Sequence, residues 1–249
     1  MRAMNAKSDL VFNIVLIIFC ILLTIIIIYP LYFVCIASIS HPSAVANGDT
    51  LLLPKKITFA GYEEIFKDPR IGNGFKNTFI YTTLGTLVSM LFTISAAYAL
   101  SRKDLKTRGF FMFFFTFTMF FSGGLIPEYI TVKHFRMDNS LWVMIIPFSV
   151  NVFNLIIART YFQTSIPEGL LEAAQIDGCS DLRFFVRIVL PLSKAILTVI
   201  SLYYMVTYWN EYFKALIYLR DNKLYPLQLI LRDILVRNQS YASGEMVGG

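Results

Sequence analysis

The chain has 249 residues, of which 56% are hydrophobic and only 15% are charged. Because soluble domains carry about 25% charged residues, this composition excludes an ordinary soluble domain and predicts a polytopic membrane protein. The formal net charge of +6 does not indicate a nucleic-acid partner, since the Lys and Arg residues are scattered among loops between apolar segments. Cys20, Cys35 and Cys179 have no paired spacing, so neither a disulfide framework nor a metal site is predicted.

The first membrane span is predicted at residues 11–36. Residues 10–48 contain no Asp, Glu, Lys or Arg. The apolar part is long enough to cross a bilayer, whereas the apolar core of a signal peptide has about 7 to 15 residues. Pro30 is expected to kink the helix near its outer end. A polar segment with several prolines follows at 40–76, which predicts an external loop with at most a short helix at 62–66.

Three further spans are predicted at residues 77–101, 109–127 and 139–158, because none of these apolar segments contains Asp, Glu, Lys or Arg. Between the first two of them, residues 102–108 hold four basic residues in seven positions. Short loops rich in Lys and Arg remain in the cytoplasm, so this loop is predicted to be cytoplasmic.

A polar segment at 164–191 separates the fourth span from the fifth. Ser165 followed three residues later by Glu168 is a capping-box signature, and Pro167 falls in the first turn. This pattern predicts a short amphipathic helix that begins near Ile166.

The same segment is predicted to contain a turn and a second helix. The first helix should end at Asp177 and Gly178, because glycine can take the left-handed conformation that closes a helix. Ser180 can cap a second helix, and Pro191 ends that helix or joins it to the next span. Counting spans places this segment on the same side as residues 102–108, which is the cytoplasm.

The fifth span is predicted at 192–213, although its uncharged core, 195–210, has only 16 residues. The rest of the chain is polar to mixed, with an amphipathic piece at 227–235. No sixth apolar segment follows in the sequence.

Seven residues of the polar segment match the motif E-A-A-x(3)-G-x(9)-I-x-L-P with every spacing kept: Glu172, Ala173, Ala174, Gly178, Ile188, Leu190 and Pro191. In this the chain resembles the inner-membrane permease subunits of binding-protein-dependent ABC importers. Residues 29–40, 121–127 and 225–235 are similar to the maltose-type carbohydrate permeases, in particular to the branch called LplC-like or YtcP-like. From the residues alone, the alternative interpretation of the polar segment is an ordinary amphipathic cytoplasmic helix.

The resemblance implies an all-α type I ABC importer transmembrane domain in the plasma membrane of a prokaryote. It implies that the polar segment is a coupling loop that docks into a cleft of a cytoplasmic ATPase. The implied partners are a second, homologous permease subunit, an ABC ATPase dimer, an extracytoplasmic solute-binding protein and membrane lipid. ATP and Mg would be bound by the ATPase, and no cofactor is expected in this chain. The coupling residues that the resemblance implies are Glu172, Ala173, Ala174, Asp177 and Gly178.

The resemblance has one clear departure. Permeases of this type have a sixth membrane helix and a cytoplasmic C-terminus, whereas five predicted spans leave the C-terminus outside. A truncated chain is therefore expected.

Catalytic motifs are absent from the sequence, which contains no G-x(4)-G-K-[ST], H-E-x-x-H, G-x-S-x-G or C-x-x-C. We therefore expect a transport subunit that does not hydrolyse ATP itself. A polytopic membrane enzyme is a poor alternative, because it would need ionisable groups within its spans and the first four predicted spans have none. A permease for amino acids or other small solutes remains an alternative, since the motif is shared among such permeases. The resemblance and the uncharged spans favour a sugar or oligosaccharide.

Polar and aromatic residues near the ends of the fourth and fifth spans are candidates for the solute path, because amide and aromatic groups can bind a sugar. The aromatic residues also fit the belt that such side chains form at the membrane surface. The candidate path residues are Asn151, Asn154, Tyr208, Trp209, Asn210 and Glu211.

Overall fold

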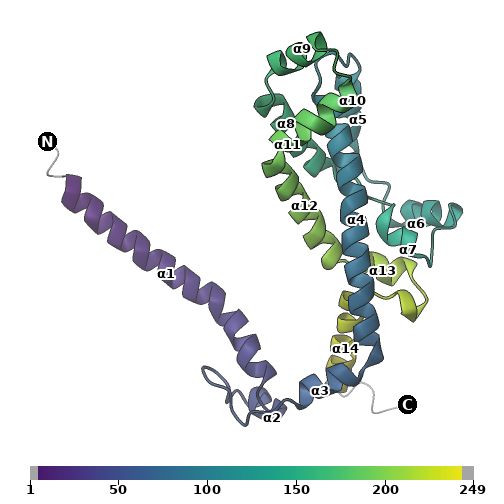
Figure 1. Cartoon of the computed structure of the whole chain (residues 1–249). Helices are drawn as coiled ribbons and strands as arrows, with labels where there is room; N and C mark the ends of the chain where they lie inside the picture. The colour runs from purple at the N-terminus through teal and green to yellow at the C-terminus, as the bar shows by residue number, and fades with distance from the viewer. Residues whose placement is uncertain (1–4, 243–249) are drawn as a thin grey trace. The chain divides into compact units, whose positions relative to one another are not determined.

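The computed structural model describes residues 5–242, and all regular secondary structure in that part of the chain is helical (Figure 1). The chain divides into two compact units, Met1–Asp68 and Pro69–Gly249. An all-helical fold suits the apolar composition, because in a bilayer a helix satisfies its backbone hydrogen bonds within one segment of chain.

The first unit begins with one long helix, α1 (Asn5–Ser38). Its segment Phe12–Ser38 is long and apolar enough to cross a membrane, and Pro30 lies inside it. The side chains at positions 12–32 are all exposed. Such a surface of Ile, Leu and Phe is compatible with lipid and not with water.

Two short helices complete the first unit. α3 (Ala60–Lys67) includes the short helix predicted at 62–66. The prediction of at most one helix in this segment was wrong, because α2 (Pro42–Ala46) also forms; proline is well suited to the first turn of a helix. The Tyr62 hydroxyl donates a hydrogen bond to Ser38 Oγ at 2.9 Å. The chain after α1 therefore folds back onto the end of that helix.

The second unit is built on α4 (Pro69–Ser101), which runs along its whole length (Figure 1). α4 packs against α12 (Lys194–Trp209), α8 (Val152–Ser165) and α14 (Leu227–Ala242). The helix begins eight residues before the predicted span at 77–101, because proline is well suited to the first turn of a helix.

The buried face of α4 consists largely of small side chains. Small residues let neighbouring helices approach closely inside a membrane. A Cβ atom at Gly74 would lie 2.5 Å from Ile230 Cδ1, and one at Gly85 would lie 2.5 Å from Tyr208 Cε1. The other small residues buried on this face are Thr78, Thr86, Ser89, Thr93 and Ala97.

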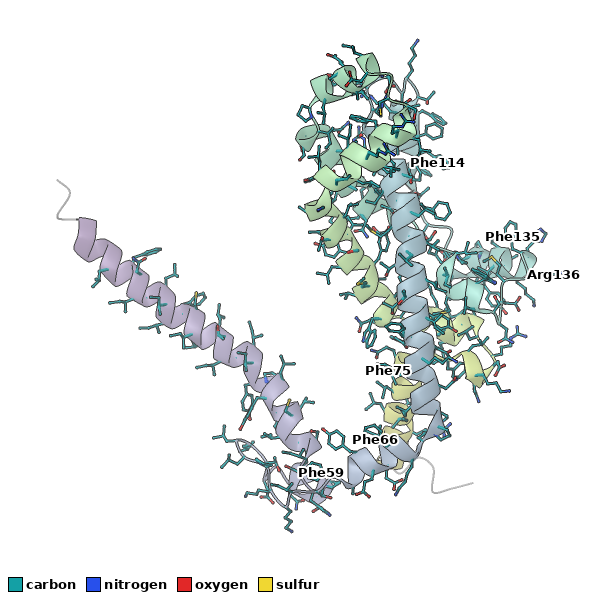
Figure 2. All side chains as sticks on the ribbon, viewed as in Figure 1. Phe59, Phe66, Phe75, Phe114, Phe135 and Arg136 are labelled. Atoms are coloured by element: carbon teal, nitrogen blue, oxygen red, sulfur yellow. The ribbon has the colours of Figure 1, made fainter. Side chains whose placement is uncertain are left out.

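Two of the predicted spans are broken in the structure. The predicted span at 109–127 is helical as α5 (Arg108–Phe120), and after a turn the chain continues as α6 (Leu125–His134), which is bent by 116° from α5. Gly124 adopts a φ of +82° at this turn. Phe135 and Arg136 lie at the end of α6 that points away from α4 (Figure 2).

The predicted span at 139–158 forms two separate helices, α7 (Leu141–Ile145) and α8, with non-helical residues between them. By length and composition, two described helices can cross a membrane, or up to four spans exist if each sharply bent pair is one span. After α12 the chain forms α13 (Phe213–Tyr218), a 3₁₀ turn (Asn222–Leu224) and α14.

The close packing at Gly85 leads to a first prediction. Gly85→Ala should lower the free energy of unfolding by about 1 to 3 kcal/mol, because the Tyr208 ring must move to admit the methyl group. Gly72→Ala on the same helix is the matched control, since a Cβ there meets nothing within 4 Å. Thermal unfolding of the purified proteins in detergent measures the stability of both variants. Equal unfolding temperatures for the two would contradict close packing at Gly85.

Candidate functional site

The segment that carries the E-A-A motif joins α8 to α12, and we call residues 166–193 the motif loop. In Figure 1 it caps one end of α4, whereas α14 lies beside the other end. The chain bends by 83° between Asp181–Leu192 and Lys194–Trp209, where the loop meets α12. The helices of the motif loop are α9 (Glu168–Ile176), α10 (Asp181–Phe184), a π-helical turn (Phe185–Val189) and α11 (Leu190–Leu192).

The predicted capping box at the start of α9 is not formed. Ser165 is instead the last residue of α8, and Pro167 is the N-cap of α9, without a side-chain capping bond. The reason is local, because a proline disfavours helical conformation in the residue before it. Ile166 accordingly has an extended conformation, with ψ at 107°.

The predicted end of α9 is confirmed. Asp177 is the C-cap, and Gly178 has a φ of +71°. The Cys179 N–H donates to the Ala174 carbonyl at 2.9 Å, and the Gly178 N–H donates to the Gln175 carbonyl at 3.0 Å. These two bonds form a Schellman motif, in which a left-handed residue, here glycine, lets the chain satisfy the last carbonyls of the helix.

The predicted coupling residues lie on two sides of α9. Ala174 is buried at 8% exposure and belongs to the core that includes Phe162 of α8 and Phe184 of α10. The other four, Glu172, Ala173, Asp177 and Gly178, are exposed. Ala174 therefore holds α9 on the second unit, while the remaining four leave an open surface on the loop.

The basic loop at 102–108 is bound to the motif loop. Arg102 donates to Asp181 Oδ1 at 3.0 Å and to both carboxylate oxygens of Asp104, at 2.8 and 2.6 Å. The hydrogen bond with Asp104 raises the pKa of Arg102 and lowers the pKa of the Asp104 carboxyl. Lys103 forms a further ion pair with Glu168 at the start of α9.

A pocket of about 510 Å³ lies where these two loops meet. Arg102, Lys103 and Arg108 line its basic side, and Glu168 lines its acidic side. In the sequence these basic residues indicated only membrane topology. Their contact with the motif loop was not predicted, because Arg102 and Asp181 are 79 positions apart.

Two of the predicted path residues are buried in the second unit, Tyr208 on α12 and Asn154 on α8. Tyr208 and Asn154 are both buried, at 6% exposure. The Tyr208 hydroxyl is 2.9 Å from Ser89 Oγ and donates to the Ile145 carbonyl at 3.3 Å. Asn154 is adjacent in the chain to the buried Leu155 of α8. Both side chains therefore face the interior of the second unit.

The remaining predicted path residues lie at the ends of helices. Asn151 is exposed and caps α8, accepting from the Asn154 N–H at 3.1 Å. Trp209 is partly buried and packs edge-on against Phe75. Asn210 is exposed, and its amide donates to the Val206 carbonyl at 2.8 Å.

Glu211 differs from these residues because it forms an ion pair inside the second unit. One carboxylate oxygen is 3.1 Å from Lys214 Nζ, and the other accepts from the Lys214 backbone N–H at 3.1 Å. The structure thus places Asn151 and Asn154 at the start of α8 and Tyr208 against the end of α7. Glu211 lies just beyond the end of α12.

The family described as "Binding-protein-dependent transport system inner membrane component" matches residues 89–234, which include the motif loop. The chain belongs to this family. It is a multi-pass permease subunit of the cytoplasmic membrane and a transport component rather than an enzyme, as the sequence predicted. Membership implies that an ATPase and a binding protein work with it.

The permease is similar to two proteins of Bacillus subtilis (strain 168). It is 41% identical over 218 residues to the polygalacturonan/rhamnogalacturonan transport system permease protein YtcP, a match that covers 88% of this chain and 76% of YtcP. It is 35% identical over 232 residues to LplC, with 93% of this chain and 78% of LplC covered. The predicted resemblance to this branch is confirmed.

A solved structure shows the fold. The permease matches a chain from the crystal structure of a bacterial ABC transporter involved in the import of the acidic polysaccharide alginate, with a TM-score of 0.87 and 33% identity. The match covers 96% of this chain and 86% of the other. The predicted fold, an importer transmembrane domain built from helices, is confirmed.

The contacts of Arg102 support a second prediction. Arg102→Ala should lower the free energy of unfolding by about 1 to 2 kcal/mol, because it removes charge-assisted hydrogen bonds whose carboxylate partners are largely exposed. The free energy of unfolding of Arg102→Lys should lie between those of the parent and of Arg102→Ala, since an ammonium cannot reproduce the planar fork of a guanidinium. Lys106→Ala, an exposed change in the same loop, is the control. Identical unfolding temperatures for Arg102→Ala and Lys106→Ala would contradict this role.

Proposed function

We propose that this permease forms part of the translocation path for an oligosaccharide. The observation that supports this most is the likeness over nearly the whole chain to YtcP and to the alginate transporter. A permease with 28% identity is named for melibiose, raffinose and stachyose, and one with 27% identity for arabinooligosaccharides. Sugars of more than one unit are therefore the shared solute class among these similar proteins.

An acidic oligosaccharide is the finer proposal. Polygalacturonan is a polymer of uronic acid, and alginate is described as an acidic polysaccharide; these solutes belong to the more similar proteins. The sugars named for the proteins at 27% and 28% identity are neutral. A neutral oligosaccharide, which the uncharged spans favoured in the sequence, is the second candidate.

The permease is further proposed to pair with a second, similar permease subunit and to work with a dimer of ABC ATPase subunits. In this proposal the exposed side of α9 docks on the ATPase, with Glu172 and Ala173 at the contact. ATP binding closes the ATPase dimer and brings the motif loops together, and ATP hydrolysis lets them separate so that the spans open inward. ATP and Mg belong to the ATPase in this scheme.

The solute class is tested with the complete complex in proteoliposomes, including its binding protein. An oligogalacturonate should stimulate ATP hydrolysis and accumulate inside the vesicles, while raffinose should do neither. The reverse result would replace the acidic solute with a neutral one. Stimulation by an amino acid and by neither sugar would overturn the proposal of an oligosaccharide importer.

The coupling role of the motif loop is tested at Gly178. Gly178→Val should strain the backbone by about 1 to 3 kcal/mol and misalign α9, because the residue has a φ of +71°. Glu172→Lys should reverse an exposed charge at the docking surface. Both variants should lower uptake and stimulated ATP hydrolysis while solute binding by the binding protein stays unchanged.

Gly169→Val is the matched control for Gly178→Val. A Cβ at either glycine meets nothing within 4 Å, and only Gly178 has a positive φ. If both valine variants and Glu172→Lys transported like the parent complex, α9 would not be the coupling helix.

A further inference from the structure

The break between α7 and α8 holds a bulky residue in a strained conformation. Phe148 has a φ of +64°, in the left-handed region that L residues with large side chains rarely adopt. Its side chain is nevertheless 47% exposed, so burial of the ring in the core does not explain the strain. Strained residues of this kind persist where the surrounding structure fixes them, and they cluster at ligand sites.

Two tyrosines of α12 fix the ends of the break. The Tyr208 hydroxyl donates to the Ile145 carbonyl at the end of α7, and the Tyr204 hydroxyl accepts from the Asn151 N–H at the start of α8, at 3.0 Å. Tyr204 is itself 2.6 Å from Thr93 of α4. One backbone group at each end of the break, the Ile145 carbonyl and the Asn151 N–H, therefore has a buried tyrosine as its partner.

A charged pair lies beside the exposed ring. Lys214 Nζ is 5.4 Å from the centroid of the Phe148 ring, and the same ammonium is 3.1 Å from Glu211 Oε2. The Lys214 and Glu211 side chains are 25% and 15% exposed. An ammonium has three N–H donors, so Lys214 keeps donor capacity after binding Glu211.

These features place the break next to water. Irregular backbone at membrane depth is tolerated only where it is buried in protein or lines an aqueous cavity, and ionisable groups within a membrane protein mark solute pathways. α8 has 14 residues between the break and the motif loop, which corresponds to about 21 Å of helix. This is less than the roughly 30 Å of a bilayer's hydrocarbon core, so the break lies away from the motif loop at membrane depth.

We propose that Phe148, Lys214 and Glu211 form a solute-binding subsite in the translocation path, within the membrane and open to water from the outside. The face of the Phe148 ring stacks on the apolar face of one sugar ring. Lys214 donates to a carboxylate or hydroxyl of that sugar, and Glu211 accepts from a hydroxyl. The identity of the solute as a sugar rests on the proposed function, whereas the aqueous position of the break does not.

Accessibility tests the position of the subsite. In the assembled complex, with Cys20, Cys35 and Cys179 replaced by serine, Phe148→Cys should react with a membrane-impermeant maleimide added from the outside. Bound oligogalacturonate, delivered by the binding protein, should slow this reaction. A cysteine at 148 that does not react would overturn the subsite, whatever the solute is.

Uptake tests the role of the ring. Phe148→Leu should reduce uptake of oligogalacturonate by about three- to ten-fold, because stacking on an aromatic ring is lost, while Phe148→Tyr should retain uptake. Phe153→Leu is the matched control, since Phe153 is another exposed phenylalanine of the same broken span. Equal uptake by Phe148→Leu and the parent, or an equal loss in Phe153→Leu, would overturn the stacking role.

A third variant leaves the break untouched. Lys214→Met should reduce uptake of oligogalacturonate more than uptake of raffinose. If Phe148→Leu does not assemble, this variant tests the subsite in its place. Uptake equal to that of the parent for Lys214→Met would then overturn the subsite. A parent complex that transports neither sugar would overturn the proposed function alone, because the accessibility of position 148 is measured separately.

Discussion

The hydroxyl contacts between α4 and α12 are the interaction on which the second unit depends. Ser89 and Thr93 on α4 meet Tyr208 and Tyr204 on α12, and all four side chains are buried. In a bilayer, apolar surface gives no net drive for two helices to associate, so close packing and interhelical hydrogen bonds hold them together. Gly85 brings the α4 backbone directly against the Tyr208 ring. The face of α4 that carries small side chains therefore packs directly against the two tyrosines of α12.

The same tyrosines determine where the neighbouring span is interrupted. Each hydroxyl can donate one hydrogen bond and accept others. Because Tyr208 donates to the Ile145 carbonyl, its bond with Ser89 is one that it accepts; because Tyr204 accepts from the Asn151 N–H, it is free to donate to Thr93. The chain can leave the helical conformation at this point because these side chains satisfy the exposed backbone groups.

Local features of the sequence predicted local structure well. Gly178 predicted the end of α9 correctly, because this prediction depends only on the backbone conformation of one glycine. The motif that indicated the family lies in one short segment, whereas the likeness that confirms the fold covers 96% of the chain. The break at Phe148 was not predicted, although Pro147 in the middle of residues 139–158 is a signal for it, because proline removes a helical hydrogen bond. The bond from Arg102 to Asp181 was missed because its partners meet only after folding.

α8 connects the two parts of the permease that are proposed to act in transport. It begins at the break, where Asn151 is bound to Tyr204, and it ends at Ser165, next to the motif loop. A continuous helix of this length keeps its rise per residue, so it cannot absorb a displacement by stretching. A movement of α9 must therefore either shift the break or slide α8 along α4. The bond between Asn151 and Tyr204 opposes the first. The second is opposed by the bond from Arg159 Nε to the Leu100 carbonyl at 3.0 Å and by the edge-on contact between Tyr98 of α4 and Phe162 of α8. The packing of this unit therefore favours a movement in which α4 and α8 shift together.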